Sequence, residues 1–100
     1  MSLESITETV KTKVGNDCGL GATLKFHLGS DGVILIDATQ VPNVVSNDDG
    51  AAQCTIKMKL SDLEDMLVGK LDPMAAFSLG KLQLEGDLGV AMKLGNLMKR

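Results

Sequence analysis

The sequence predicts an α+β fold, in which helices gather on a mostly antiparallel sheet. Two observations lead to this prediction. The spacing of the apolar residues changes along the chain in the order helix, three or four strands, two short helices, strand and helix. The length of 100 residues suits one core, so we expect a single domain over residues 1–100. This core should be aliphatic, because hydrophobic residues make up 44% of the chain and aromatic residues only 2%.

The first expected elements are a helix and a strand. Apolar residues recur at helical spacing between positions 3 and 14, Ser2 can cap this helix, and Gly15 can end it. From Leu24 to Leu28 apolar and polar residues alternate, which is typical of a strand with one buried face.

A hairpin and a second strand are expected next. The sequence "GSDG" at 29–32 predicts a hairpin turn. The run "VILID" at 33–37 does not alternate, so we expect a central strand that is covered on both faces. Pro42 then limits residues 38–50 to an edge strand or a loop.

Another strand and two short helices follow. Residues 54–60 alternate cleanly and predict a strand with one solvated face. Ser61 and Glu64 match the capping box S-x-x-E, which predicts the start of a short helix. Asp72 and Pro73 are suited to the cap and the first position of a further helix.

The last two elements are a strand at 81–85 and a helix from Leu88 to about Met98, capped by Asp87. The apolar residues of this helix cover far more than the stripe of about 100° that a surface helix needs. Two interpretations remain open. The surplus can fill a well-packed aliphatic core, or it can line a cavity or groove whose Leu, Ile and Met side chains repack around apolar ligands.

Composition and motifs argue against several classes of function. The formal net charge is −3, charges of both signs are mixed, and Trp and Tyr are absent, so we expect no nucleic-acid partner. His27 lies on the polar side of its strand, and Cys18 and Cys54 form no C-x-x-C pair. We therefore expect free thiols, no metal and no cofactor. No motif frames a nucleophile with a base, so we expect no enzyme activity.

Residues 70–94, "KLDPMAAFSLGKLQLEGDLGVAMKL", resemble the signature end of the sterol carrier protein type 2 family, the non-specific lipid-transfer domains. The upstream segments "DGVILID" and "CTIKMKLSDLEDMLVGK" are also similar to that family. The resemblance implies a five-stranded, mainly antiparallel sheet covered by helices, with an apolar tunnel between sheet and helices. It also implies binding and transfer of fatty acids, acyl-CoAs, phospholipids or sterols, without catalysis.

The same resemblance implies a set of apolar lipid-binding positions on the second strand and in the C-terminal third. These positions are Ile34, Ile36, Phe77, Leu79, Leu82, Leu84, Leu88 and Met92. The chain has "VILI" where family members often carry an aromatic residue, and Ser78 where a second one is common. These departures leave the preferred lipid open.

The remaining expectations concern partners and location. Lys93, Lys99 and Arg100 could approach an anionic lipid surface, or could equally complement the dipole of a solvated helix end. The alternative to a lipid carrier is a protein-interaction module or a homodimer that uses the apolar C-terminal helix. No partner protein is identifiable from the sequence. We expect a cytoplasmic protein, because the sequence has no signal peptide, transmembrane segment or C-terminal peroxisomal signal.

Overall fold

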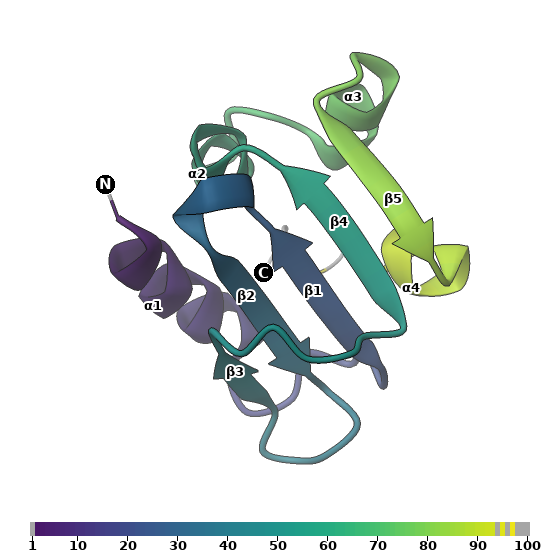
Figure 1. Cartoon of the computed structure of the whole chain (residues 1–100). Helices are drawn as coiled ribbons and strands as arrows, with labels where there is room; N and C mark the ends of the chain where they lie inside the picture. Colours follow the sequence, from purple (N-terminus) through teal and green to yellow (C-terminus); the bar gives the residue numbers. More distant parts are fainter. Residues whose placement is uncertain (1, 94, 96, 98–100) are drawn as a thin grey trace.

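The structure, a computed structural model, describes residues 2–93, 95 and 97, and Figure 1 shows how its elements are arranged. Along the chain the elements are α1 (Leu3–Val14), β1 (Thr23–His27), the 3-10 helix η1 (Gly29–Asp31), β2 (Val33–Asp37), β3 (Val44–Ser46), β4 (Cys54–Met58), α2 (Leu60–Leu67), α3 (Pro73–Ser78), β5 (Leu82–Gly86) and α4 (Leu88–Met92). This order confirms the predicted α+β class. In the described part of the chain, every helix is too short or too polar to cross a membrane.

The strands form one five-stranded sheet in the order β3-β2-β1-β4-β5. The pairs β1–β2, β2–β3 and β4–β5 are antiparallel, whereas β1 and β4 are parallel. The predicted five-stranded, mainly antiparallel sheet is therefore confirmed. The strand predicted to be central, β2, is an interior strand but lies next to the β3 edge. β1 occupies the middle, because the chain passes from β3 across the sheet and β4 pairs with the free side of β1.

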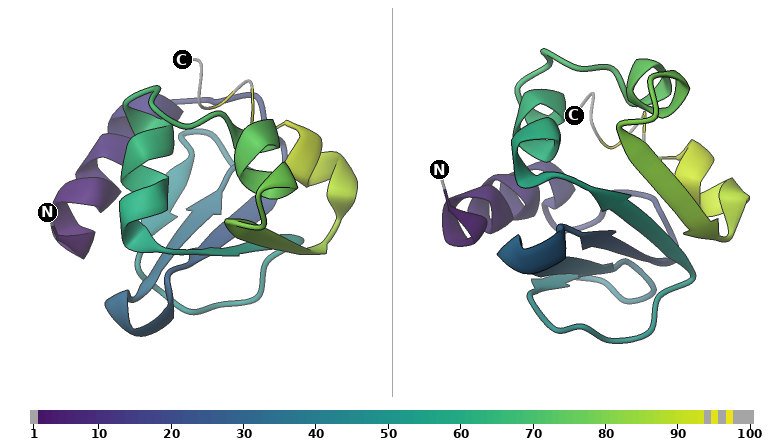
Figure 2. Two further views of the ribbon diagram at one scale, coloured as in Figure 1. Left: turned by 90° about the horizontal axis from the view of Figure 1, so that it is seen from above. Right: turned by 45° about the horizontal axis from the view of Figure 1, so that its top comes forward.

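The helices gather on one face of this sheet, as the two views of Figure 2 show. The opposite face is partly covered by the irregular segment between β3 and β4, which crosses in front of β2 and β1 in Figure 1. Lys25 Nζ holds this segment by donating to Asp49 Oδ1 at 2.8 Å and to the carbonyl of Gly50 at 3.0 Å. Leu35, on the same face, is only half-buried. The second face of β2 is therefore covered less fully than predicted.

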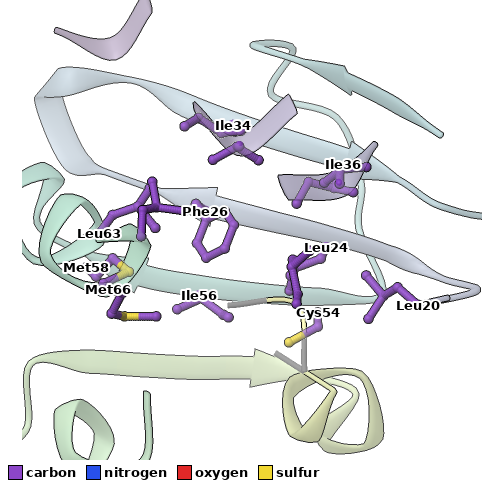
Figure 3. Close-up of a cluster of buried hydrophobic side chains, with 14 of the residues drawn as sticks. Leu20, Leu24, Phe26, Ile34, Ile36, Cys54, Ile56, Met58, Leu63 and Met66 are labelled. Atoms are coloured by element: carbon purple, nitrogen blue, oxygen red, sulfur yellow. The ribbon is translucent and has the colours of Figure 1, made fainter. Parts of the chain in front are cut away.

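The core lies between the sheet and its helices, and Figure 3 shows part of it. The largest fully buried side chains come from β1, β2 and β4 and from the inner faces of α1 and α2. They are Leu24, Phe26, Ile34, Ile36, Ile56, Val10, Val14, Leu63 and Met66. The core is aliphatic apart from Phe26, as the composition predicts.

Three of the predicted helix caps are confirmed and one is wrong. Ser2 accepts a hydrogen bond from the N–H of Ser5, while Asp72 and Asp87 cap α3 and α4. The capping box at Ser61 is absent, because the N-cap of α2 is Lys59, two residues before Ser61, in an extended conformation and without a side-chain hydrogen bond. Leu60 packs against the core, and this contact moves the start of the helix ahead of the polar motif.

The last helix was predicted to reach about Met98. The described part of α4 ends at Met92, and beyond it Leu97 is buried, with its N–H 3.2 Å from the carbonyl of Lys93. Residues 94, 96 and 98–100 lie outside the described residues. The predictions for Leu94, Met98, Lys99 and Arg100 therefore concern residues outside the described part of the chain.

Candidate functional site

An apolar groove of about 350 Å³ lies between α3, β5 and α4. The described residues that line it are Asp72, Pro73, Met74, Phe77, Leu82, Leu84, Leu88, Ala91, Met92 and Gly95. Its volume falls at the lower end of the range of roughly 300–1,000 Å³ that is typical of small-molecule sites. The lining contains one charged side chain among these residues, which makes the groove suited to an apolar ligand.

The side chains of the groove differ in their exposure. Leu82 is buried and Leu84 is half-buried on β5, so these two residues form the floor. On the helical walls Phe77 is 51% exposed, Leu88 61% and Met92 82%. Large apolar side chains that are exposed and clustered mark an interaction or ligand site, whereas single ones are common on any surface.

Each helical wall has one small residue that is buried. Ala76 is the buried residue of α3, and Val90 is the buried residue of α4. On the exposed side of these short helices lie the larger residues Phe77, Leu88 and Met92. The larger side chains of both helices consequently remain available to the groove.

The turns on either side of β5 set the positions of these walls. At the start of β5, the N–H of Lys81 donates to the carbonyl of Ala76 at 2.8 Å and closes α3. At its end, Gly86 has a φ of 97°, and a Cβ there would collide with the carbonyl oxygen of Gln53. The following residue, Asp87, donates its N–H to that same oxygen at 2.7 Å. Glycine at position 86 therefore allows the backbone to approach Gln53 closely, and this turn places α4 beside the groove.

The structure brings together five of the predicted lipid-binding residues. Phe77, Leu82, Leu84, Leu88 and Met92 all line the groove.

The other three lie elsewhere. Ile34 and Ile36 are fully buried in the core on β2, and Leu79 is 67% exposed outside the groove lining. All three are apolar, and Ile34 and Ile36 lie on β2 while Leu79 follows α3. The apolar pattern of the sequence alone does not say which of these side chains come together in the fold.

The prediction missed several lining residues. Met74 and Ala91 lie three positions from Phe77 and Leu88 on their respective helices, so helical spacing could have identified both. Pro73 and Asp72 were interpreted only as helix-start residues. For Gly95 the sequence holds no such signal.

The histidine and both cysteines lie in the described part of the chain. No group of three His, Cys, Asp or Glu side chains is arranged there to hold a metal ion. The Nδ1 of His27, half-buried on β1, accepts from the N–H of Gly29 at 3.4 Å. Both cysteines are free. Burial raises the pKa of the Cys54 thiol, and the charge of Asp87 raises it further.

Lys93 makes a hydrogen bond that ties the end of α4 to the rest of the domain. Its Nζ donates to the carbonyl of Leu20 at 3.2 Å, next to a smaller pocket of about 150 Å³ that Cys18, Leu20 and Leu97 help to line. This bond holds one of the cations that were considered for contact with anionic lipid.

Comparisons with known proteins find similar sequences and structures. A model of the SCP-2 sterol transfer family matches residues 18–99. Sterol carrier protein 2 from Bos taurus is 49% identical over 55 residues, which are 55% of this chain and 10% of the bovine protein. The human protein of the same name is 47% identical over 55 residues. The matched segment thus spans only a tenth of the length of these relatives, 10% in both cases.

Solved structures show the same fold. The crystal structure of sterol carrier protein 2 like 2 from Aedes aegypti has a TM-score of 0.76 at 24% identity, covering 95% of this chain and 94% of that one. The solution structure of the palmitated Aedes aegypti protein has a TM-score of 0.72 at 24% identity, covering 100% of this chain and 96% of that one.

Proposed function

The chain belongs to the SCP-2 sterol transfer family, and from this membership we propose that it carries lipids by enclosing their apolar part in the groove between α3, β5 and α4. The family assigns it to the lipid-binding or lipid-transfer domains. The groove supports a specific place for the ligand, because large exposed apolar side chains from two helices converge there over an apolar floor.

The proposed lipid contacts are the five groove residues Phe77, Leu82, Leu84, Leu88 and Met92. Met74 and Ala91 join them on the helical walls. Ile34 and Ile36 are fully buried in the core on β2, and Leu79 lies outside the lining, so we leave these three out of the proposed contact set.

The proposed ligand class is a lipid with at least one acyl or alkyl chain, including fatty acids, acyl-CoAs and phospholipids. The palmitated relative from Aedes aegypti supports an acyl chain, and the sterol carrier proteins support sterols as a further ligand. Burying ten methylenes contributes roughly 8 kcal/mol at about 0.8 kcal/mol each, before the cost of ordering the ligand is subtracted. The proposed role is binding and release without chemistry on the lipid.

The test is native mass spectrometry of gently purified protein, followed by displacement of a fluorescent lipid. A carrier should retain lipid from the expression host or exchange it for the added probe. A tight dimer that neither retains nor exchanges lipid would overturn the proposal.

The same experiment tests a second candidate function, a protein-interaction module or homodimer. One observation favours it: the exposed side chains of Met74, Phe77, Leu88 and Met92 cluster at the groove and form an apolar patch that a second copy or a partner protein could cover. Loss of dimer on adding lipid would show that the two functions compete for one surface.

A further inference from the structure

The groove between α3, β5 and α4 carries a methionine thioether on each of its helical walls. Met74 lies on α3 and is 73% exposed, and Met92 lies on α4 and is 82% exposed; both line the groove. The other two methionines that the structure describes, Met58 and Met66, are buried in the core at 7% and 1% exposure. An oxidant in solution therefore reaches the two groove sulfurs more readily than the two core sulfurs.

We propose that Met74 and Met92 form an oxidation site, at which hydrogen peroxide converts both thioethers to sulfoxides and lowers the affinity of the groove for lipid. This inference rests on the proposed lipid-binding function and adds a form of regulation to it. At each sulfur a lone pair attacks one peroxide oxygen, and an S–O bond forms as the O–O bond breaks. The proton of the transferred oxygen passes to the departing hydroxide, which leaves as water. The sulfur is oxidised by two electrons and the peroxide is reduced by two.

The lining of the groove explains why oxidation weakens binding. A thioether is apolar and flexible and adapts to an alkyl chain, whereas a sulfoxide is polar and its oxygen is a hydrogen-bond acceptor. Among the described lining residues no side chain carries an N–H or O–H donor, since Asp72 is the one polar side chain and an ionised carboxylate only accepts. Lipid that covers the sulfoxides removes their contact with water without replacing the lost hydrogen bonds, and this cost weakens binding.

The test measures oxidation and lipid affinity on the same protein. The purified protein is treated with hydrogen peroxide, catalase then removes the peroxide, and dithiothreitol returns oxidised cysteines to thiols. Peptide mass spectrometry should find sulfoxide at Met74 and Met92 at least about tenfold faster than at Met58 and Met66. The dissociation constant of a fluorescent long-chain alcohol should rise roughly tenfold, which corresponds to about one methylene lost from contact at each groove sulfur. Methionine sulfoxide reductases should reverse this rise.

A pair of double variants assigns the effect to the groove. Met74→Leu with Met92→Leu removes both exposed thioethers and keeps side chains of similar volume. Each protein is compared with itself before and after peroxide, so a change in its starting affinity cancels. The dissociation constant of this variant should rise by less than about twofold on oxidation. The matched control, Met58→Leu with Met66→Leu, removes two buried thioethers and should keep the tenfold rise.

The outcomes separate this inference from the proposed function. If the untreated protein does not bind the fluorescent alcohol, the lipid-binding proposal fails and the inference falls with it. If the protein binds the probe, but full conversion of Met74 and Met92 to sulfoxides leaves affinity unchanged, only the inference is overturned. An equal loss of affinity in the Met74→Leu, Met92→Leu variant overturns it as well. A loss that this variant prevents and the matched control keeps supports the oxidation site.

Discussion

Substitution of Met92 by glutamate places a charge directly in the proposed lipid site. Met92 lines the groove on α4 and is 82% exposed in the structure, so its side chain contributes little to folding. We therefore expect Met92→Glu to change the free energy of unfolding by no more than about 0.5 kcal/mol. Any loss of lipid binding would then arise from the groove itself.

The expected loss follows from the contacts that Met92 can offer. If its side chain covers two to three methylenes of the ligand at about 0.8 kcal/mol each, the substitution removes roughly 2 kcal/mol and weakens binding about 30-fold. The assay is displacement of a fluorescent long-chain alcohol, because an uncharged probe avoids direct repulsion by the new carboxylate.

Leu79→Glu is the matched control for Met92→Glu. Leu79 is 67% exposed and lies at the end of α3 but outside the groove lining, so the same change should alter affinity by less than about twofold. Unchanged affinity in folded Met92→Glu would refute the placement of the lipid in this groove. An equal loss in Leu79→Glu would show that the ligand reaches beyond the lining described above.

Three further predictions concern the fold around the site. Gly86→Ala should lower the free energy of unfolding in urea by about 2 kcal/mol or more, because the residue has φ of 97° and its Cβ would meet a carbonyl oxygen; a wild-type midpoint would contradict this. The hydrogen bond and charge of Lys25 hold the pKa of Asp49 below its ordinary value of 3.8. A lowered pKa stabilises the fold above that value, and the stabilisation is lost as the pH falls through the folded pKa, so Asp49→Asn should flatten the decline of stability below about pH 4. Equal slopes in the two proteins would argue against this ion pair in solution. Finally, Ellman's reagent should label half-buried Cys18 faster than Cys54, whose side chain is 1% exposed and whose pKa is raised by burial; labelling at equal rates would disagree with the burial of β4.

The elements of the fold were predictable where the signal is local. Ser2, Asp72 and Asp87 were identified as helix caps because a cap depends on a side chain and backbone groups two or three positions away. The start of α2 was not, since Leu60, half-buried against the core, is already helical ahead of the motif at Ser61.

The pairing of the strands and the membership of the site depend on such distant contacts. Alternation on β1 and β4 predicts two strands, but it does not reveal that they run parallel and adjacent. Likewise, Ile36 and Leu84 are both apolar, and both lie on the face of the sheet that the helices cover. Ile36 is fully buried in the core. Leu84 is only half-buried on the groove floor, because β5 is the edge strand and is flanked by two short helices, α3 and α4, rather than by one long helix.

The burial of one small residue in each groove wall has a consequence for how such a domain can diversify. Ala76 and Val90 secure α3 and α4, whereas Phe77, Leu88 and Met92 add little to the stability of the domain. Substitutions at the latter three positions can therefore reshape the groove at small cost to folding. Under the proposed function, the shape of the groove and the stability of the fold depend on largely different side chains of α3 and α4, so the lipid preference can change without redesign of the core.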